Sequence, residues 1–65
     1  MMKNARYDLF RNVPGSSPEL IAQNLTQGQC KKAVERDARL LSNVLRLSEK
    51  LILGTEWTAE YHRAA

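Results

Sequence analysis

The residues from Cys30 to Leu53 constrain the fold most, because these twenty-four positions contain neither glycine nor proline. On a helical wheel at about 100° per residue, their apolar side chains fall on two adjacent ridges that together cover roughly 180°. The pattern predicts one long amphipathic helix, about 33 Å long at about 1.5 Å per residue. The first ridge comprises Ala33, Asp37, Leu40, Val44, Leu47 and Leu51, and the second comprises Val34, Ala38, Leu41, Leu45, Ser48 and Ile52.

This apolar face is wider than a surface helix needs. A stripe of about 100° is enough to pack one helix onto a core, and a chain of 65 residues offers little to cover the rest. Each Leu or Ile left in water forgoes about 1.5–3 kcal/mol of burial. We therefore expect a homodimer rather than a compact three-helix monomer. The predicted dimer seam comprises Leu40, Val44, Leu47 and Leu51.

Size and composition limit the remaining possibilities. Sixty-five residues make one domain at most, and a domain of this size is marginally stable alone. The single cysteine cannot form an internal disulfide, and without a Cys/His cluster it predicts no structural zinc. No apolar run is long enough for a membrane span and no signal peptide is visible, so we expect a cytoplasmic protein without membrane contact.

The segments around the long helix predict an all-α fold. We expect residues 1–17 to form an N-terminal arm or a short helix over residues 4–12, with a turn at Pro14–Pro18. Residues 18–65 would form a helical domain. Its fold would be a helical hairpin with a long central amphipathic helix and a short C-terminal helix. The expected helices cover residues 18–27, 30–53 and 56–64.

The breaks between these helices follow from capping residues. Pro18 suits the first helical position, and Gly28 can end the first helix with a positive φ. Gly54 ends the long helix in the same way, and Thr55 can cap the last one.

The sequence shows no catalytic constellation. His62 is the only histidine, and Glu56 and Glu60 are more typical of surface ion pairs than of paired catalytic carboxylates. Cys30 fits a small buried apolar residue. There is no phosphate-binding loop, dinucleotide motif or metal-ligand spacing, so we expect no enzyme, no cofactor and no metal.

Two features indicate binding to a partner. A row of basic side chains lies on the long helix. The first interpretation is a face exposed to solvent, the second is a surface that binds an acidic protein, and the third is a surface that binds nucleic acid. Trp57 and Tyr61 lie four residues apart and would share one helical face, with Trp57 as a core or interface anchor. The basic row comprises Lys32, Arg36, Arg39, Arg46 and Lys50, and the partner-binding candidates are Arg36, Arg39, Arg46, Trp57 and Tyr61.

One set of spacings resembles a known family. Ala22, Leu25, Gly28, Cys30 and Ala33 form the pattern A-x-x-L-x-x-G-x-C-x-x-A, and Trp57 and Arg63 follow the long helix. Over about residues 20–63 this is similar to the AraC negative regulator family of small bacterial proteins. Cys30 stands where that family often has an aromatic residue, and no cysteine follows Arg63. The first part also resembles one tetratricopeptide hairpin.

The resemblance implies a helical, self-associating negative regulator. Such a protein would bind an AraC-type transcription activator of virulence genes and keep it from dimerising or from holding DNA. Two other hypotheses remain open on the residues alone. One is a small DNA-binding regulator that uses the basic row, and the other is a helical secretion co-chaperone.

Overall fold

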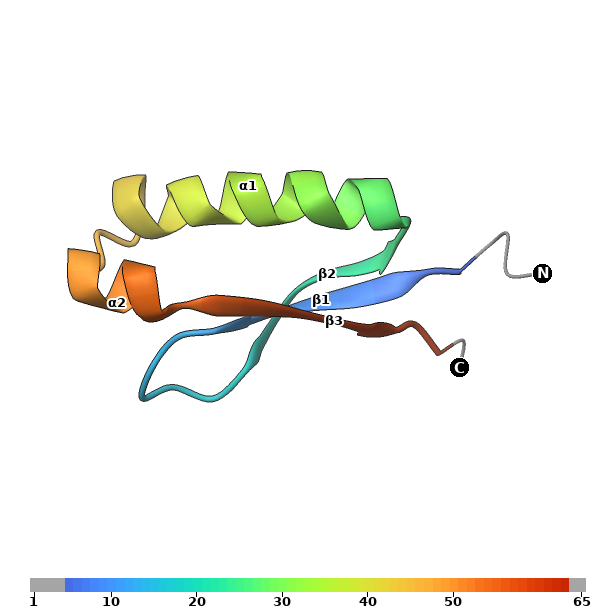
Figure 1. The fold of residues 1–65 in the computed structure, drawn as a ribbon, viewed down its shortest axis with the longest axis horizontal. Coiled ribbons are helices and arrows are strands. Elements are labelled where there is room, and N and C mark those ends of the chain that lie inside the picture. Colours follow the sequence, from blue (N-terminus) through green and yellow to red (C-terminus); the bar gives the residue numbers. More distant parts are fainter. Residues whose placement is uncertain (1–4, 64–65) are drawn as a thin grey trace.

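Three strands and two helices make up residues 5–63, which are the residues described in the computed structural model. The strands form an antiparallel sheet in the order β2-β1-β3, and α1 lies along one face of it (Figure 1). The predicted all-α fold is therefore wrong, because the protein is mixed α/β. The elements are β1 (Tyr7–Asn12), β2 (Glu19–Leu25), α1 (Gln27–Asn43), α2 (Glu49–Gly54) and β3 (Glu56–Tyr61).

The central strand is β1, where the sequence predicted an arm or a short helix. Its side chains alternate between the two faces of the sheet, as the period of two requires. Leu9 is only 2% exposed, and Arg11 is also buried. The odd-numbered positions of β1 therefore face α1, and a segment predicted to be an arm or a short helix forms the central strand of the sheet.

The hairpin partner β2 replaces the predicted helix over residues 18–27. Phe10 pairs with Leu20 and Arg11 pairs with Glu19, so non-local pairing overrides the local helical preference. The predicted turn at Pro14–Pro18 is confirmed as the hairpin loop, in which Gly15 has a φ of +84°. Near its end β2 departs from regular pairing, and Asn24 has a φ of +58°.

The C-terminal strand β3 replaces the predicted helix over residues 56–64. It pairs with β1 along its whole length, from Asn12–Glu56 to Tyr7–Tyr61, and the two tyrosine rings stack with centroids 5.4 Å apart. A spacing of four residues, as between Trp57 and Tyr61, keeps side chains on one face in both a helix and a strand. The aromatic spacing therefore did not exclude a strand.

The predicted helix over residues 30–53 is wrong as a single element, because it divides into α1 and α2. Val44 caps the C-terminus of α1, and Arg46 follows with a φ of +53°. Ser48 then begins α2 by accepting a hydrogen bond from the Leu51 amide at 3.3 Å. Capping side chains and one left-handed residue end and restart the helix without any glycine or proline.

The C-terminal end of α2 lies at the predicted break between Gly54 and Thr55. Gly54 ends this helix, as expected for the long one, and a Cβ there would lie 2.8 Å from Cγ of Pro14 in the hairpin loop. Thr55 does not cap a further helix. It is buried, and its hydroxyl donates to the Leu51 carbonyl at 2.7 Å.

The hydrophobic core is small. Among the described residues only Leu9, Cys30 and Leu41 are buried apolar side chains, in a molecule that measures 42 × 21 × 16 Å. No helix within residues 5–63 has the length and apolar character to cross a membrane. Several large apolar side chains stay exposed: Leu20, Leu40, Val44, Leu45, Leu53 and Tyr61.

The start of α1 provides a test of this fold. Thr26 and Gln29 form a reciprocal capping box, with Thr26 Oγ1 accepting from the Gln29 amide at 3.2 Å and Gln29 Oε1 accepting from the Thr26 amide at 2.9 Å. We expect Thr26→Ala to lower the free energy of unfolding by about 1 kcal/mol, because an amide of the first turn loses its acceptor. Urea denaturation followed by circular dichroism measures this.

Ser42→Ala is the matched control, because Ser42 is exposed within the same helix. It should be neutral or slightly stabilising. Equal losses in both variants would contradict the capping box and its place at the strand-to-helix junction.

Candidate binding surface

A buried ion pair joins α1 to the sheet. Asp37 on α1 is 5% exposed and accepts a hydrogen bond on Oδ1 from Nη1 of Arg11 on β1 at 2.8 Å. Its second oxygen, Oδ2, accepts from the indole Nε1 of Trp57 on β3, also at 2.8 Å. Nη2 of Arg11 lies 3.2 Å from Oε1 of Glu19 on β2. This group, which we call the Asp37 cluster, connects the helix with all three strands.

The geometry of the Asp37 cluster is that of a structural link. Both carboxylate oxygens of Asp37 have a donor, and the guanidinium of Arg11 offsets its charge. Among the described residues no buried side-chain polar atom lacks a hydrogen-bond partner. Trp57, a predicted core or interface anchor, is half-buried and held within the fold by Asp37.

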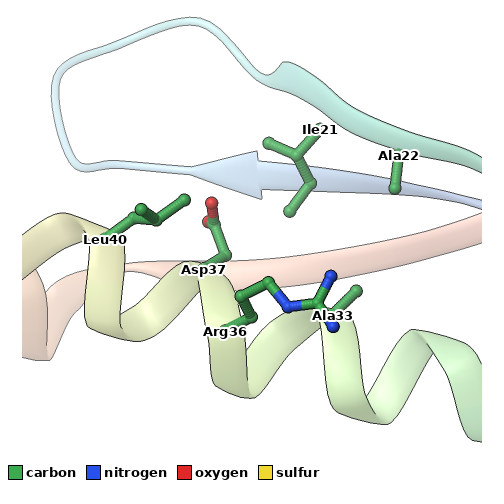
Figure 2. A pocket seen from close by; sticks show the side chains of 6 residues that line it. All are labelled: Ile21, Ala22, Ala33, Arg36, Asp37 and Leu40. Atoms are coloured by element: carbon green, nitrogen blue, oxygen red, sulfur yellow. The ribbon is translucent and has the colours of Figure 1, made fainter. Parts of the chain in front are cut away.

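A groove runs beside this cluster, between β2 and α1. One hollow of about 130 Å³ lies between Ile21 and Ala22 of β2 and the side chains of α1 opposite them (Figure 2). A second hollow of about 260 Å³ shares Ala22, Ala33 and Arg36 with the first. We call the two together the α1–β2 groove. Its lining comprises Ile21, Ala22, Leu25, Gln29, Lys32, Ala33, Arg36, Asp37 and Leu40.

The predicted dimer seam does not form one ridge on one helix. Leu40 and Val44 are exposed, at 41% and 65%, at the C-terminal end of α1. Leu47 lies in the connection between the helices and Leu51 lies in α2, and both are half-buried. The C-terminal end of α1 and the helix α2 lie at the same end of the molecule (Figure 1). We call the exposed apolar side chains from Leu40 to Leu53 the apolar end. It comprises Leu40, Val44, Leu45 and Leu53.

The predicted basic row is also divided. Lys32, Arg36 and Arg39 are exposed on α1, but Arg46 lies in the connection between the helices and Lys50 lies in α2. Arg36 lines both hollows of the groove, whereas Arg39 lines neither. The residues singled out from the sequence therefore include three that line the groove, Lys32, Arg36 and Leu40. They do not include its apolar side chains on β2, a segment that was predicted to be a helix.

The C-terminal end of the sheet holds the only histidine. Nδ1 of His62 lies 2.7 Å from Oδ1 of Asp8, and the same oxygen accepts from the Asn24 amide at 3.1 Å. A hollow of about 420 Å³ nearby is lined by Asp8, Glu60, Tyr61 and Arg63, with Tyr61 itself 68% exposed. The His62–Asp8 pair thus joins the residue after β3 to β1 and, through the Asn24 amide, to the irregular part of β2.

Cys30 faces the interior near the start of α1. Burial raises the pKa of its thiol above the ordinary value of 9.0, because desolvation disfavours the thiolate. It borders a hollow of about 190 Å³ together with Tyr7, Gln27 and Ala59. A protonated, buried thiol is a poor nucleophile at neutral pH. Across residues 5–63 no group of three His, Cys, Asp or Glu side chains is placed to hold a metal ion.

Comparison with family models, with curated proteins and with solved structures gave no match to this chain. The resemblance to the AraC negative regulators therefore rests on its motif residues alone. The structure distributes these over β2, α1 and β3, with Ala22 and Leu25 on a strand and Gly28, Cys30 and Ala33 on a helix. They do not form the helical hairpin that the resemblance implied.

The Asp37 cluster predicts a strong dependence of stability on Asp37. We expect Asp37→Leu to lower the free energy of unfolding by about 3–5 kcal/mol, because it leaves the buried Arg11 without its main counter-charge and the Trp57 indole without an acceptor. Thermal and urea unfolding of the purified variant measure the loss.

The double variant Arg11→Met with Asp37→Leu is the matched control, since it removes both charges and keeps apolar volume. We expect it to regain a large part of the lost stability. A single variant as stable as the native chain would show that the buried pair does not hold α1 on the sheet.

Proposed function

We propose that this chain is a small self-associating protein that acts by binding another protein rather than by catalysis. The observation that carries the proposal is the apolar end, where Leu53 is 78% exposed and Val44 is 65% exposed. Large apolar side chains gathered at one end of a small domain are typical of protein contact surfaces.

A second copy of the chain is the occupant that best fits the apolar end. With only three buried apolar side chains among residues 5–63, the monomer gains little from its own core. A partner that covers the apolar end would bury further apolar surface, and another copy of the chain can do so without a further component. The wide apolar face read from the sequence supports the same proposal, although α1 and α2 now share it.

The target of such a regulator is suggested by the sequence pattern alone. The residues that resemble the AraC negative regulators imply an AraC-type transcription activator, and we propose it as the first target to test. The DNA-binding alternative has less support, because the basic row that it requires is divided between α1, the connection and α2.

Self-association through the apolar end predicts a change in molecular mass. We expect Val44→Glu combined with Leu53→Glu to convert a dimer into a monomer, because two charges would be buried in the contact. Analytical ultracentrifugation over a concentration series measures the mass, and circular dichroism checks the fold. Both side chains are largely exposed in the monomer, so the fold should persist.

The matched control is Leu20→Glu, which places the same charge at an exposed Leu on β2 rather than at the apolar end. It should leave the dimer intact. A native chain that stays monomeric at high concentration, or a dimer that survives the double substitution, would contradict self-association through this surface.

Protein contact with an activator predicts a direct complex. We expect the purified chain to bind a purified AraC-type activator and to reduce its occupancy of operator DNA, measured by fluorescence anisotropy of labelled DNA. The chain alone should leave the anisotropy of the DNA unchanged. Direct, salt-sensitive binding of the chain to duplex DNA would instead favour the DNA-binding alternative.

A further inference from the structure

The α1–β2 groove lies against an unpaired strand edge. In the order β2-β1-β3, β2 pairs only with β1, so its outer edge has no strand beside it within residues 5–63. An edge strand offers backbone donors and acceptors to another extended chain. The groove is lined by β2, the strand with that edge, and by the side chains of α1 that lie opposite it (Figure 2). A free edge beside a groove is the arrangement with which a sheet accepts an added peptide strand.

The dimensions of the groove fit a short extended segment. Its α1 wall runs from Gln29 to Leu40, eleven residue steps or about 16 Å at about 1.5 Å per residue. An extended chain covers about 3.3 Å per residue, so about five residues would fill this length. The apolar side chains of Ile21 and Leu40 line only the first hollow, and Lys32 lines only the second.

The charge of the groove selects an acidic occupant. Asp37 lies in the lining, but both of its oxygens are already engaged, one of them by Arg11, which also pairs with Glu19 at the start of β2. Lys32 and Arg36 are exposed and form no ion pair with any residue that the structure describes. Pairing of two copies through β2 would bring these like charges together across the contact, which disfavours a second copy here.

The spacing of the wall residues sets the pattern of the occupant. Leu40, Arg36 and Lys32 follow one another at four-residue steps, so they stand about 6 Å apart along α1. Side chains on one face of an added strand repeat about every 6.6 Å, at every second residue. We propose that the α1–β2 groove binds an extended segment of another protein with the pattern apolar-x-acidic-x-acidic, added as a fourth strand beside β2.

The probe is a fluorescent, terminally blocked peptide of the sequence Thr-Val-Thr-Glu-Thr-Glu-Thr, together with its reverse, because a strand can add in either direction. We expect one of the two to bind at about 150 mM salt, where non-specific charge attraction is screened. The same peptide with Lys in place of Glu should not bind. Amide chemical shifts in NMR should change along Ile21–Leu25 and Ala33–Leu40.

Charge reversal tests the acidic contact. We expect Arg36→Glu to weaken binding of the acidic peptide at least about tenfold and to create binding of the lysine peptide. Arg39→Glu is the matched control, because Arg39 is an exposed arginine on α1 outside the groove lining. It should change the affinity by no more than about twofold. Equal losses in both variants would overturn the proposal, since they would show only attraction to a basic protein.

N-methylated peptides test the added strand. Only alternate amides of an added strand face β2, so methylation of one alternate set should abolish binding and methylation of the other should have little effect. Equal tolerance of both sets, or no binding of either peptide, would overturn the proposal. Leu40 belongs to both the α1–β2 groove and the apolar end, so the titration is repeated in the Val44→Glu, Leu53→Glu double variant. Retained binding by a monomeric variant separates this groove from the proposed self-association.

Discussion

The fold depends on one buried carboxylate, that of Asp37. A sheet of three strands and one covering helix has few apolar side chains to bury, and here only Leu9, Cys30 and Leu41 are fully enclosed. Apolar packing alone specifies little about how the helix sits on such a sheet. Two directed hydrogen bonds of 2.8 Å, from Arg11 and from Trp57, fix Asp37 against the central strand and one edge strand. Hydrogen-bond geometry thus supplies the orientation that a larger core would otherwise provide.

The two proposed contact surfaces lie on either side of this link. The Asp37 cluster joins α1 to β1 and β3 through two hydrogen bonds, while β2 reaches the cluster through the exposed Glu19. The groove lies between α1 and β2, beside the cluster. Toward the C-terminal end of α1, Leu41 is buried in the core, whereas Leu40 and Val44 stay exposed. The polar link and the exposed apolar side chains are consequences of the same small core.

The sequence predicted the turn at Pro14–Pro18 and much of α1, but not the sheet. Local signals were sufficient at the turn, which proline and glycine mark, and in α1, where apolar residues recur at helical spacing around Asp37 and Leu41. Local signals failed where pairing partners are far apart in the sequence. Trp57 and Tyr61, four residues apart, would lie on one face of either a helix or a strand. Only the pairing of this segment with β1 makes it a strand. One signal for the site was present: an aspartate at position 37 within an apolar ridge requires a buried donor, and Arg11 supplies it.

The free edge of β2 raises the question of why the chain does not aggregate through it. Natural proteins protect such edges with charges and with bulges. Here the pairing of β2 becomes irregular near Leu25, where Asn24 adopts a left-handed conformation, and Lys32 and Arg36 stand beside the edge. Two copies that approached through β2 would meet with like charges, whereas an acidic strand would meet opposite ones. The features that keep the edge from pairing with itself are therefore the same features that would give it a preferred partner.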